Sequence, residues 1–228
     1  MTRIGDGLAG QRVLVTQCRD FMGPALCAAF ADHGATVIAD GEPLAAPGAA
    51  ERLVASAGRV DVLIPNLAVP APSTRAGDVT DEEWRHVFSH LVDPLPRLLR
   101  AVLPQMSERG AGKIVVMGSA AALRGINGAS TYSAARGAQL SWVRAVGTEL
   151  APANIHVNMI AQNFVDNATY FPPAVQRMPA FQQRLKREVP LGRLGTPEED
   201  ALLAVFLASS EVNFFAGQSF PFAGGWVT

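Results

Sequence analysis

Short apolar runs alternate with longer amphipathic stretches along the whole chain. Runs this apolar, separated by segments of helical period, are typical of a parallel sheet whose two faces are both covered by helices. The pattern therefore predicts a doubly wound α/β arrangement. The predicted strands are residues 12–16, 35–39, 60–64, 112–117, 155–159 and 218–222.

Helix signals fill the intervals between these runs. Residues 80–83 read Thr-Asp-Glu-Glu, a capping box that predicts a helical segment to residue 106, broken near Pro94. Further helices are expected over 23–33, 49–56 and 130–150, and one starts at Pro197. The chain has neither an internal repeat nor a low-complexity linker, so we expect residues 1–228 to form one domain.

One edge of the sheet is expected to be short. Only about twenty residues separate Asp40 from Val60, and they include Pro43 and Pro47. A full doubly wound sheet needs a helix, a strand and a second helix in that interval, which is more than this length supplies. The prediction is a Rossmann-like α/β fold shortened on the side that would hold adenine, with Asp40 capping a turn or solvated.

Composition and charge exclude several classes of function. About half of the 228 residues are apolar and the net charge is −1, which favours neither nucleic acid nor an acidic membrane as partner. The sequence lacks a signal-peptide pattern and an apolar stretch of membrane-spanning length. With only Cys18 and Cys27, a disulfide framework is not expected, and His86 and His90 lack a third metal ligand. We expect a soluble cytoplasmic protein without a metal.

A serine, a tyrosine and an arginine form the most informative set of polar residues. Ser119 follows the predicted strand 112–117, so its hydroxyl is expected at the carboxyl end of the sheet, where open α/β folds bind ligands. Tyr132 and Arg136 are four residues apart on a predicted helix and share one face. A guanidinium there stabilises a phenolate. The set predicts removal of a hydroxyl proton, with Tyr132 as general base and Ser119 binding the substrate oxygen.

The loop after the first predicted strand lacks glycines that a phosphate-binding loop needs. Residues 16–23 read TQCRDFMG, with Gln17 and Phe21 in two of the expected glycine positions. Backbone approaches a pyrophosphate closely only where no side chain intervenes, and a phenylalanine fills roughly the volume of such a ligand. We therefore expect no nucleotide cofactor and no hydride transfer.

Over essentially its whole length the chain resembles the short-chain dehydrogenase/reductase superfamily. The resemblance rests on VLVT at 13–16, DVLIPN at 61–66, Ser119, YSAAR at 132–136 and PLGRLGTPE at 190–198. Within it, T-x4-F-x-G at 16–23 and S-x12-Y-x3-R at 119–136 are the patterns of the halohydrin dehalogenases. The chain is most similar to their B type.

This resemblance implies a cofactor-independent carbon–halide lyase. The substrate would be a vicinal halo-alcohol, the products an epoxide, a halide ion and a proton, and the reverse reaction would take halide or another small anion. Some relatives carry proline where this chain has Gln162, and some carry aspartate where it has Leu67. The implied catalytic residues are Ser119, Tyr132 and Arg136, and the implied halide site is Phe21, Gln162, Asn163, Phe164 and Val165.

A set of apolar and aromatic residues is predicted to line the substrate pocket. Its composition suits aliphatic and aromatic halo-alcohols alike. The superfamily resemblance also implies a homotetramer in which residues 81–106 and 130–150 pack between subunits, and a dimer is compatible with the same sequence. The predicted pocket residues are Ala121, Leu123, Ile126, Tyr170 and Phe171.

Two other classes of function compete with a dehalogenase. The chain could be a nicotinamide-dependent reductase with a divergent loop, which Gln17, Phe21 and the short edge disfavour. It could also be a binding protein without cofactor, which leaves the complete set of Ser119, Tyr132 and Arg136 without a purpose. Halide release from a small halo-alcohol, measured with and without nucleotide, separates the three.

Overall fold

A single parallel sheet forms the centre of the computed structural model, which describes residues 5–227. Within these residues six strands lie in the order β2-β1-β3-β4-β5-β6, each pairing in parallel with its neighbours. The order reverses between β1 and β3, where the carboxyl ends of the strands leave room for a ligand. The strands are β1 Arg12–Val15, β2 Thr36–Ala39, β3 Val62–Ile64, β4 Gly112–Met117, β5 Ile155–Gln162 and β6 Ser219–Phe222.

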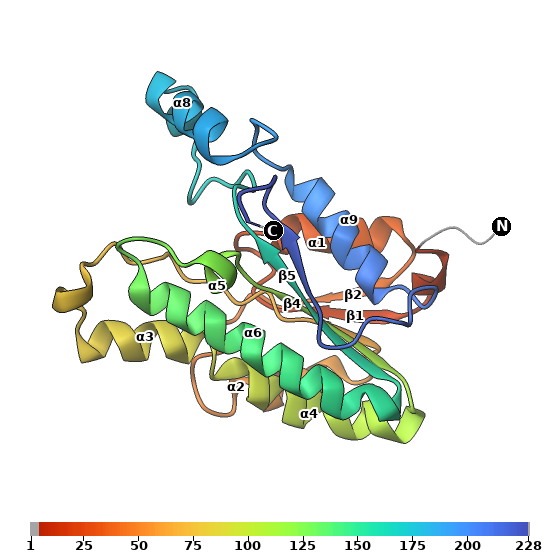
Figure 1. Ribbon diagram of the computed structural model, residues 1–228. Coiled ribbons are helices and arrows are strands. Elements are labelled where there is room, and N and C mark those ends of the chain that lie inside the picture. The colour runs from red at the N-terminus through yellow and green to blue at the C-terminus, as the bar shows by residue number, and fades with distance from the viewer. Residues whose placement is uncertain (1–4, 228) are drawn as a thin grey trace.

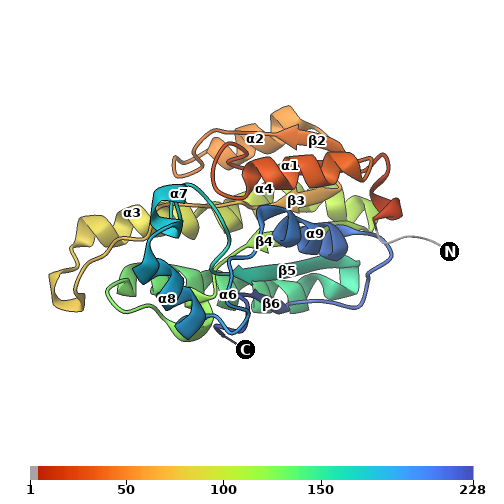
Figure 2. The same cartoon turned by 90° about the horizontal axis from the view of Figure 1, so that it is seen from above.

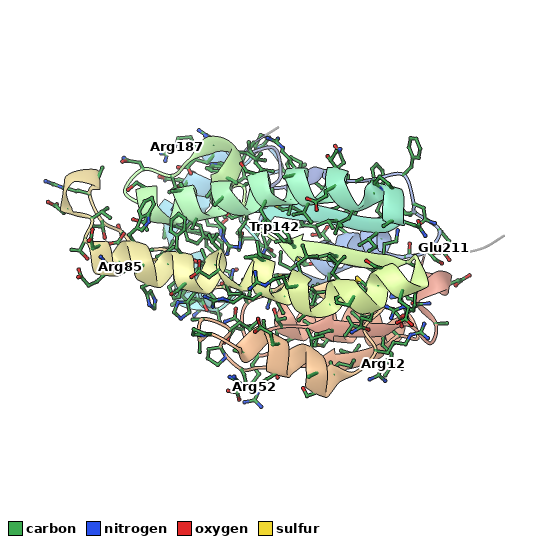
Figure 3. All side chains as sticks on the ribbon, turned by 90° about the horizontal axis from the view of Figure 1, so that it is seen from below. Arg12, Arg52, Arg85, Trp142, Arg187 and Glu211 are labelled. Atoms are coloured by element: carbon green, nitrogen blue, oxygen red, sulfur yellow. The ribbon has the colours of Figure 1, made fainter. Side chains whose placement is uncertain are left out.

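Helices cover both faces of this sheet (Figures 1 and 2). On one face α1 packs against α9, and on the other α2, α4, α3 and α6 lie side by side (Figure 3). Trp142 on α6 packs against the core of the second face. The helices are α1 Gly23–Asp32, α2 Ala49–Ala57, α3 Asp81–Leu91, α4 Pro94–Arg109, α5 Ala121–Arg124, α6 Ser130–Leu150, α7 Pro173–Gln176, α8 Pro179–Glu188 and α9 Pro197–Ala208; short 3-10 turns occupy Asp6–Leu8, Ala76–Asp78 and Ala151–Ala153.

The sequence signals explain where several helices begin. Thr80 caps α3 by accepting a hydrogen bond from the backbone of Glu83, and Pro94 starts α4 where the predicted segment breaks. Thr196 and Glu199 form a complete capping box at the start of α9. The Thr196 N–H donates to the Glu199 carboxylate at 2.9 Å, and the Glu199 N–H donates to the Thr196 hydroxyl at 3.1 Å. The predicted α/β architecture and its element positions are therefore confirmed. One strand is longer than predicted, because β5 continues to Gln162 by pairing with β6.

The sheet edge is short, as the interval between Asp40 and Val60 predicts. Only α2 connects β2 to β3, and β2 is the last strand on its side in the described chain. Asp40 caps a turn, because its carboxylate accepts a hydrogen bond from the backbone of Glu42 at 2.9 Å. Both cysteines are free thiols. Among the described helices, none has the length and apolar character needed to cross a bilayer.

A small third core holds the segment that follows β5. Two large clusters of buried side chains fill the two faces of the sheet. The third consists of Phe164, Phe181, Leu185 and Val189, with Phe171 and Trp226 packed against it. Since Phe164 follows β5 and Phe181 and Leu185 belong to α8, this cluster fixes α8 at the carboxyl end of the sheet.

Candidate active site

Ser119, Tyr132 and Arg136 line one cavity of about 340 Å³ at the carboxyl ends of the strands. Ser119 follows β4 and is held by its neighbours, because the N–H groups of Gly118 and Ala120 donate to carbonyls of β5. Tyr132 and Arg136 come from the first two turns of α6 and are 6% and 4% exposed. The helical spacing thus brings the tyrosine and the arginine together, and the end of β4 adds the serine.

The serine hydroxyl keeps a hydrogen to donate. Its Oγ accepts a hydrogen bond from the backbone N–H of Ala121 at 3.2 Å. A hydroxyl that accepts from the protein still offers its own proton to a ligand oxygen. Ser119 is 7% exposed, so such a bond would form in a largely dry site.

Arg136 is oriented by Gln139, a residue that the sequence reasoning missed. One guanidinium nitrogen, Nη1, donates to the carbonyl of Met117 at 3.2 Å and to Gln139 Oε1 at 2.9 Å. Gln139 is fully buried and is itself fixed by donating to the carbonyl of Leu91 at 2.6 Å. Its place three residues after Arg136, on a buried helix face, is the signal that could have identified it. The guanidinium carbon lies 5.0 Å from the centre of the Tyr132 ring.

The loop between β1 and α1 keeps a glycine-like backbone although it has lost two glycines. Gln17 and Phe21 have φ values of 45° and 49°, the left-handed region that costs most residues about 1–2 kcal/mol. Neighbouring residues hold this shape: Gln17 Oε1 accepts from the N–H of Ala68 at 3.0 Å. The Asn66 amide donates to the carbonyls of Gln17 and Asp20 at 3.1 and 3.0 Å.

Aromatic rings form the wall that faces Ser119, Tyr132 and Arg136. The rings of Phe21 and Tyr170 lie 5.5 Å apart between centroids, and Phe164 and Phe171 stack at 5.8 Å. The Tyr170 hydroxyl donates to the carbonyl of Val69 at 3.2 Å and accepts from the N–H of Ala71 at 3.0 Å. Burial and the nearby Tyr132 raise the pKa of Tyr170 above its usual value. Tyr170 therefore remains a neutral phenol that joins two loops of the cavity.

The segment after β5 supplies the remaining wall. Asn163 Oδ1 accepts from the N–H of Phe164 at 2.9 Å, which leaves the Asn163 side-chain nitrogen as its donor. This contact also supports the left-handed backbone of Phe164, whose φ is 54°. Gln162 Oε1 is buried and has no hydrogen-bond partner among the described residues. Val165 bridges to Gly195 across the strand ends.

The structure brings most, but not all, of the predicted residues to this cavity. All predicted catalytic and halide-site residues line it, together with Ile126, Tyr170 and Phe171. Ala121 and Leu123 do not: the short helix α5 packs on α6, and both side chains join the core on that side. Leu67 and Arg184 line the cavity in addition. Arg184 was missed because nothing in the sequence places α8 beside the ends of β4 and β5.

A family model, a curated relative and a solved structure each match this chain over most of its length. A family model described as enoyl-(acyl carrier protein) reductase matches residues 41–227. Human dehydrogenase/reductase SDR family member 4 is 31% identical over an alignment of 253 residues, which covers 99% of this chain and 90% of the human protein. A solved structure described as a dehalogenation enzyme is 31% identical, with a TM-score of 0.90 over 97% of this chain and 100% of the other.

A second solved structure supports the fold alone. It is a 3-oxoacyl (acyl-carrier-protein) reductase from Agrobacterium tumefaciens C58 with NADP bound, 24% identical, with a TM-score of 0.89 over 97% of each chain. By its fold, its family match and its relatives, the chain belongs to the short-chain dehydrogenase/reductase superfamily.

Proposed function

We propose that this protein is a halohydrin dehalogenase that needs no nucleotide cofactor. The observation that carries the proposal is the position of Phe21. It stands where a glycine of a phosphate loop would stand, with a glycine-like backbone, and its ring lines the same cavity as Ser119, Tyr132 and Arg136. The 31% identical structure described as a dehalogenation enzyme supports the same function.

The residues present do not fit the NADP that the reductase relatives imply. Gln17 and Phe21 add side chains at two positions where a pyrophosphate needs bare backbone, and Gln17 is tied to Ala68. The loop keeps a glycine at Gly23, but packing within the loop explains this glycine without a ligand. A Cβ at Gly23 would lie 2.4 Å from the backbone of Cys18. Among the described residues, the edge beyond β2 also lacks the strand and helix that would flank adenine.

The proposed reaction is an intramolecular displacement. Tyr132 accepts the proton of the substrate hydroxyl, while Ser119 donates a hydrogen bond to the substrate oxygen. That oxygen then attacks the neighbouring carbon from the side opposite the halogen. A carbon–oxygen bond forms, the carbon–halogen bond breaks, and the halide leaves with the bonding electrons. Arg136 stabilises the phenolate form of the base. Atoms and electrons balance without an external oxidant or reductant.

The departing halide needs a partly dry pocket with hydrogen-bond donors. We assign this role to Phe21, Gln162, Asn163, Phe164 and Val165, which line the cavity beside the catalytic residues. The Asn163 side-chain nitrogen is directed by the bond that its oxygen receives from Phe164. The edges of the aromatic rings carry partial positive charge, which suits an anion.

Titration of released halide tests the proposal. Wild-type protein is incubated with a small chloro- or bromo-alcohol in the absence of nucleotide, and we expect halide release with an epoxide as the second product. Tyr132→Phe abolishes release, whereas Tyr170→Phe, which removes the other phenol of the cavity, lowers it without abolishing it. Activity that appears only with NADPH would support a reductase, and silence in both assays would support a binding protein.

We further propose that the protein assembles as a homotetramer through α3, α4 and α6. These helices lie side by side on one face (Figure 3), and Trp84 on α3 is 45% exposed where it stacks on Phe88 at 4.5 Å. An exposed aromatic side chain on a helix face is typical of a contact surface. Light scattering at a mass near four times 24.1 kDa is the expected result, and a dimer mass contradicts it.

A further inference from the structure

The charged side chains that line the cavity all have the same sign. Among the described residues around it, the charged ones are Arg136 and Arg184, and aspartate and glutamate are absent from the lining. Arg136 is 4% exposed and uses Nη1 on Met117 and Gln139. Its Nε is buried without a hydrogen-bond partner. A cavity with two cations and no lining carboxylate has a positive potential and favours an anionic ligand.

Arg184 stands where this cavity meets solvent. It belongs to α8, and its side chain is 53% exposed. The guanidinium carbon lies 5.5 Å from the centre of the Phe164 ring, and Phe164 is itself 3% exposed within the third core. A guanidinium held against a ring loses little conformational freedom when it binds a ligand, so its charge is placed in advance.

The charge of Arg184 is only partly compensated. Its Nε donates to Glu188 at 3.2 Å, but Arg187 donates to the other oxygen of the same carboxylate at 2.9 Å. Two guanidinium groups thus share one carboxylate, which leaves one positive charge over. Arg187, labelled in Figure 3, is 72% exposed and does not line the cavity, so the surplus is available to a ligand through Arg184.

We propose that Arg184 binds a small anion at the mouth of the cavity. The anion has two possible sources in the reaction proposed above, on which this inference rests in part. It is the halide itself, as it leaves or enters, or it is a carboxylate carried by the halo-alcohol at the end away from the halogen. A planar guanidinium suits both, because it presents several N–H donors in a fixed arrangement.

Bromide binding tests the inference without turnover. Line broadening of the bromide NMR signal is measured with wild type, Arg184→Gln, Arg184→Lys and Lys186→Gln. Because Arg184 is half exposed, we expect Arg184→Gln to weaken bromide binding about two- to fivefold, and Arg184→Lys to recover part of the loss. Lys186→Gln removes one positive charge from the same helix, outside the cavity lining and without disturbing the pairs that Glu188 forms with Arg184 and Arg187, so bromide binding should be almost unchanged.

A matched pair of substrates distinguishes the two sources. The carboxylate 4-(2-bromo-1-hydroxyethyl)benzoate and its neutral benzamide have the same shape, and the ratio of their kcat/KM values is compared between wild type and Arg184→Gln. If the ratio of carboxylate to benzamide is lower in Arg184→Gln than in wild type, the anion that Arg184 binds is the carboxylate of the substrate. An unchanged ratio with weakened bromide binding identifies the halide.

Two results would overturn the inference. One is that Arg184→Gln changes neither the affinity for bromide nor the ratio of kcat/KM values for the two substrates. The other is an equal response to Arg184→Gln and Lys186→Gln, which would indicate a general effect of net charge. Neither result touches dehalogenation, which halide release from the neutral benzamide tests separately. The converse result is that the protein binds bromide through Arg184 and yet releases no halide from a halo-alcohol. That result would support the anion site and refute the proposed dehalogenase activity.

Discussion

Arg136 offers the sharpest test of the proposed activation of Tyr132. Its guanidinium carbon lies 5.0 Å from the centre of the Tyr132 ring, and the side chain is 4% exposed. At an effective dielectric constant of about 20, two unit charges roughly 5 Å apart attract by about 3 kcal/mol. Arg136→Met removes this charge but keeps a flexible, unbranched side chain. We expect kcat at neutral pH to fall about 100-fold.

Arg136→Lys separates the charge from the hydrogen bonds. A lysine keeps the positive charge but lacks the planar group through which Arg136 holds both the Met117 carbonyl and Gln139. We expect it to retain most of the electrostatic effect, with a loss of about tenfold or less. Both variants leave a buried acceptor poorly satisfied, so each should lower the free energy of unfolding by about 1–3 kcal/mol, measured by urea denaturation.

The comparison of the two variants decides between an electrostatic and a structural role. If the positive charge matters, Arg136→Lys keeps most of the kcat that Arg136→Met loses. Equal losses of kcat in Arg136→Met and Arg136→Lys would indicate a structural role and refute the electrostatic account.

Three further predictions follow from individual contacts. Phe21→Gly should be more stable to urea than Phe21→Ala by about 1 kcal/mol, because glycine alone adopts a φ of 49° freely. Glu83 accepts hydroxyl hydrogens from Thr74 at 2.6 Å and Thr131 at 2.7 Å, next to the cavity, so Glu83→Gln should raise KM in halide-release assays while the exposed Glu82→Gln does not. Burial raises the pKa of Asp200 to about 8. As pH rises from about 4 towards 8, the carboxyl ionises in the unfolded chain but not in the folded one, so stability falls; thermal unfolding of Asp200→Asn should lack this decline.

Local patterns predicted most of the fold and the centre of the site. Apolar runs located the strands because central parallel strands are buried on both faces, and β4 and α6 begin and end where the sequence indicates. Tyr132 and Arg136 meet because helical spacing brings them together. Ser119 follows a strand end. Each of these relations depends on residues close in the sequence or on the common direction of parallel strands.

The remaining walls of the cavity depend on packing between distant segments. The Tyr170 hydroxyl meets Val69 and Ala71 about a hundred residues earlier in the chain, and no local pattern encodes that approach. Ala121 and Leu123 lie in the right segment but on α5, whose packing against α6 turns them into the core. Arg184 reaches the cavity only because the third core fixes α8 there.

Backbone strain around the cavity links the altered loop to its proposed role. Of the non-glycine residues with positive φ in the described chain, Gln17, Phe21 and Phe164 lie in the two loops that form the cavity. Strain of this kind persists only where surrounding contacts impose it, and here Ala68, Asn66 and Asn163 supply them. A loop that had merely lost a phosphate site would gain stability by relaxing into an ordinary turn. In this protein several hydrogen bonds hold a shape that directs Phe21 and Phe164 into a cavity with Tyr132. The proposed anion pocket beside the proposed general base gives a specific reason for that shape.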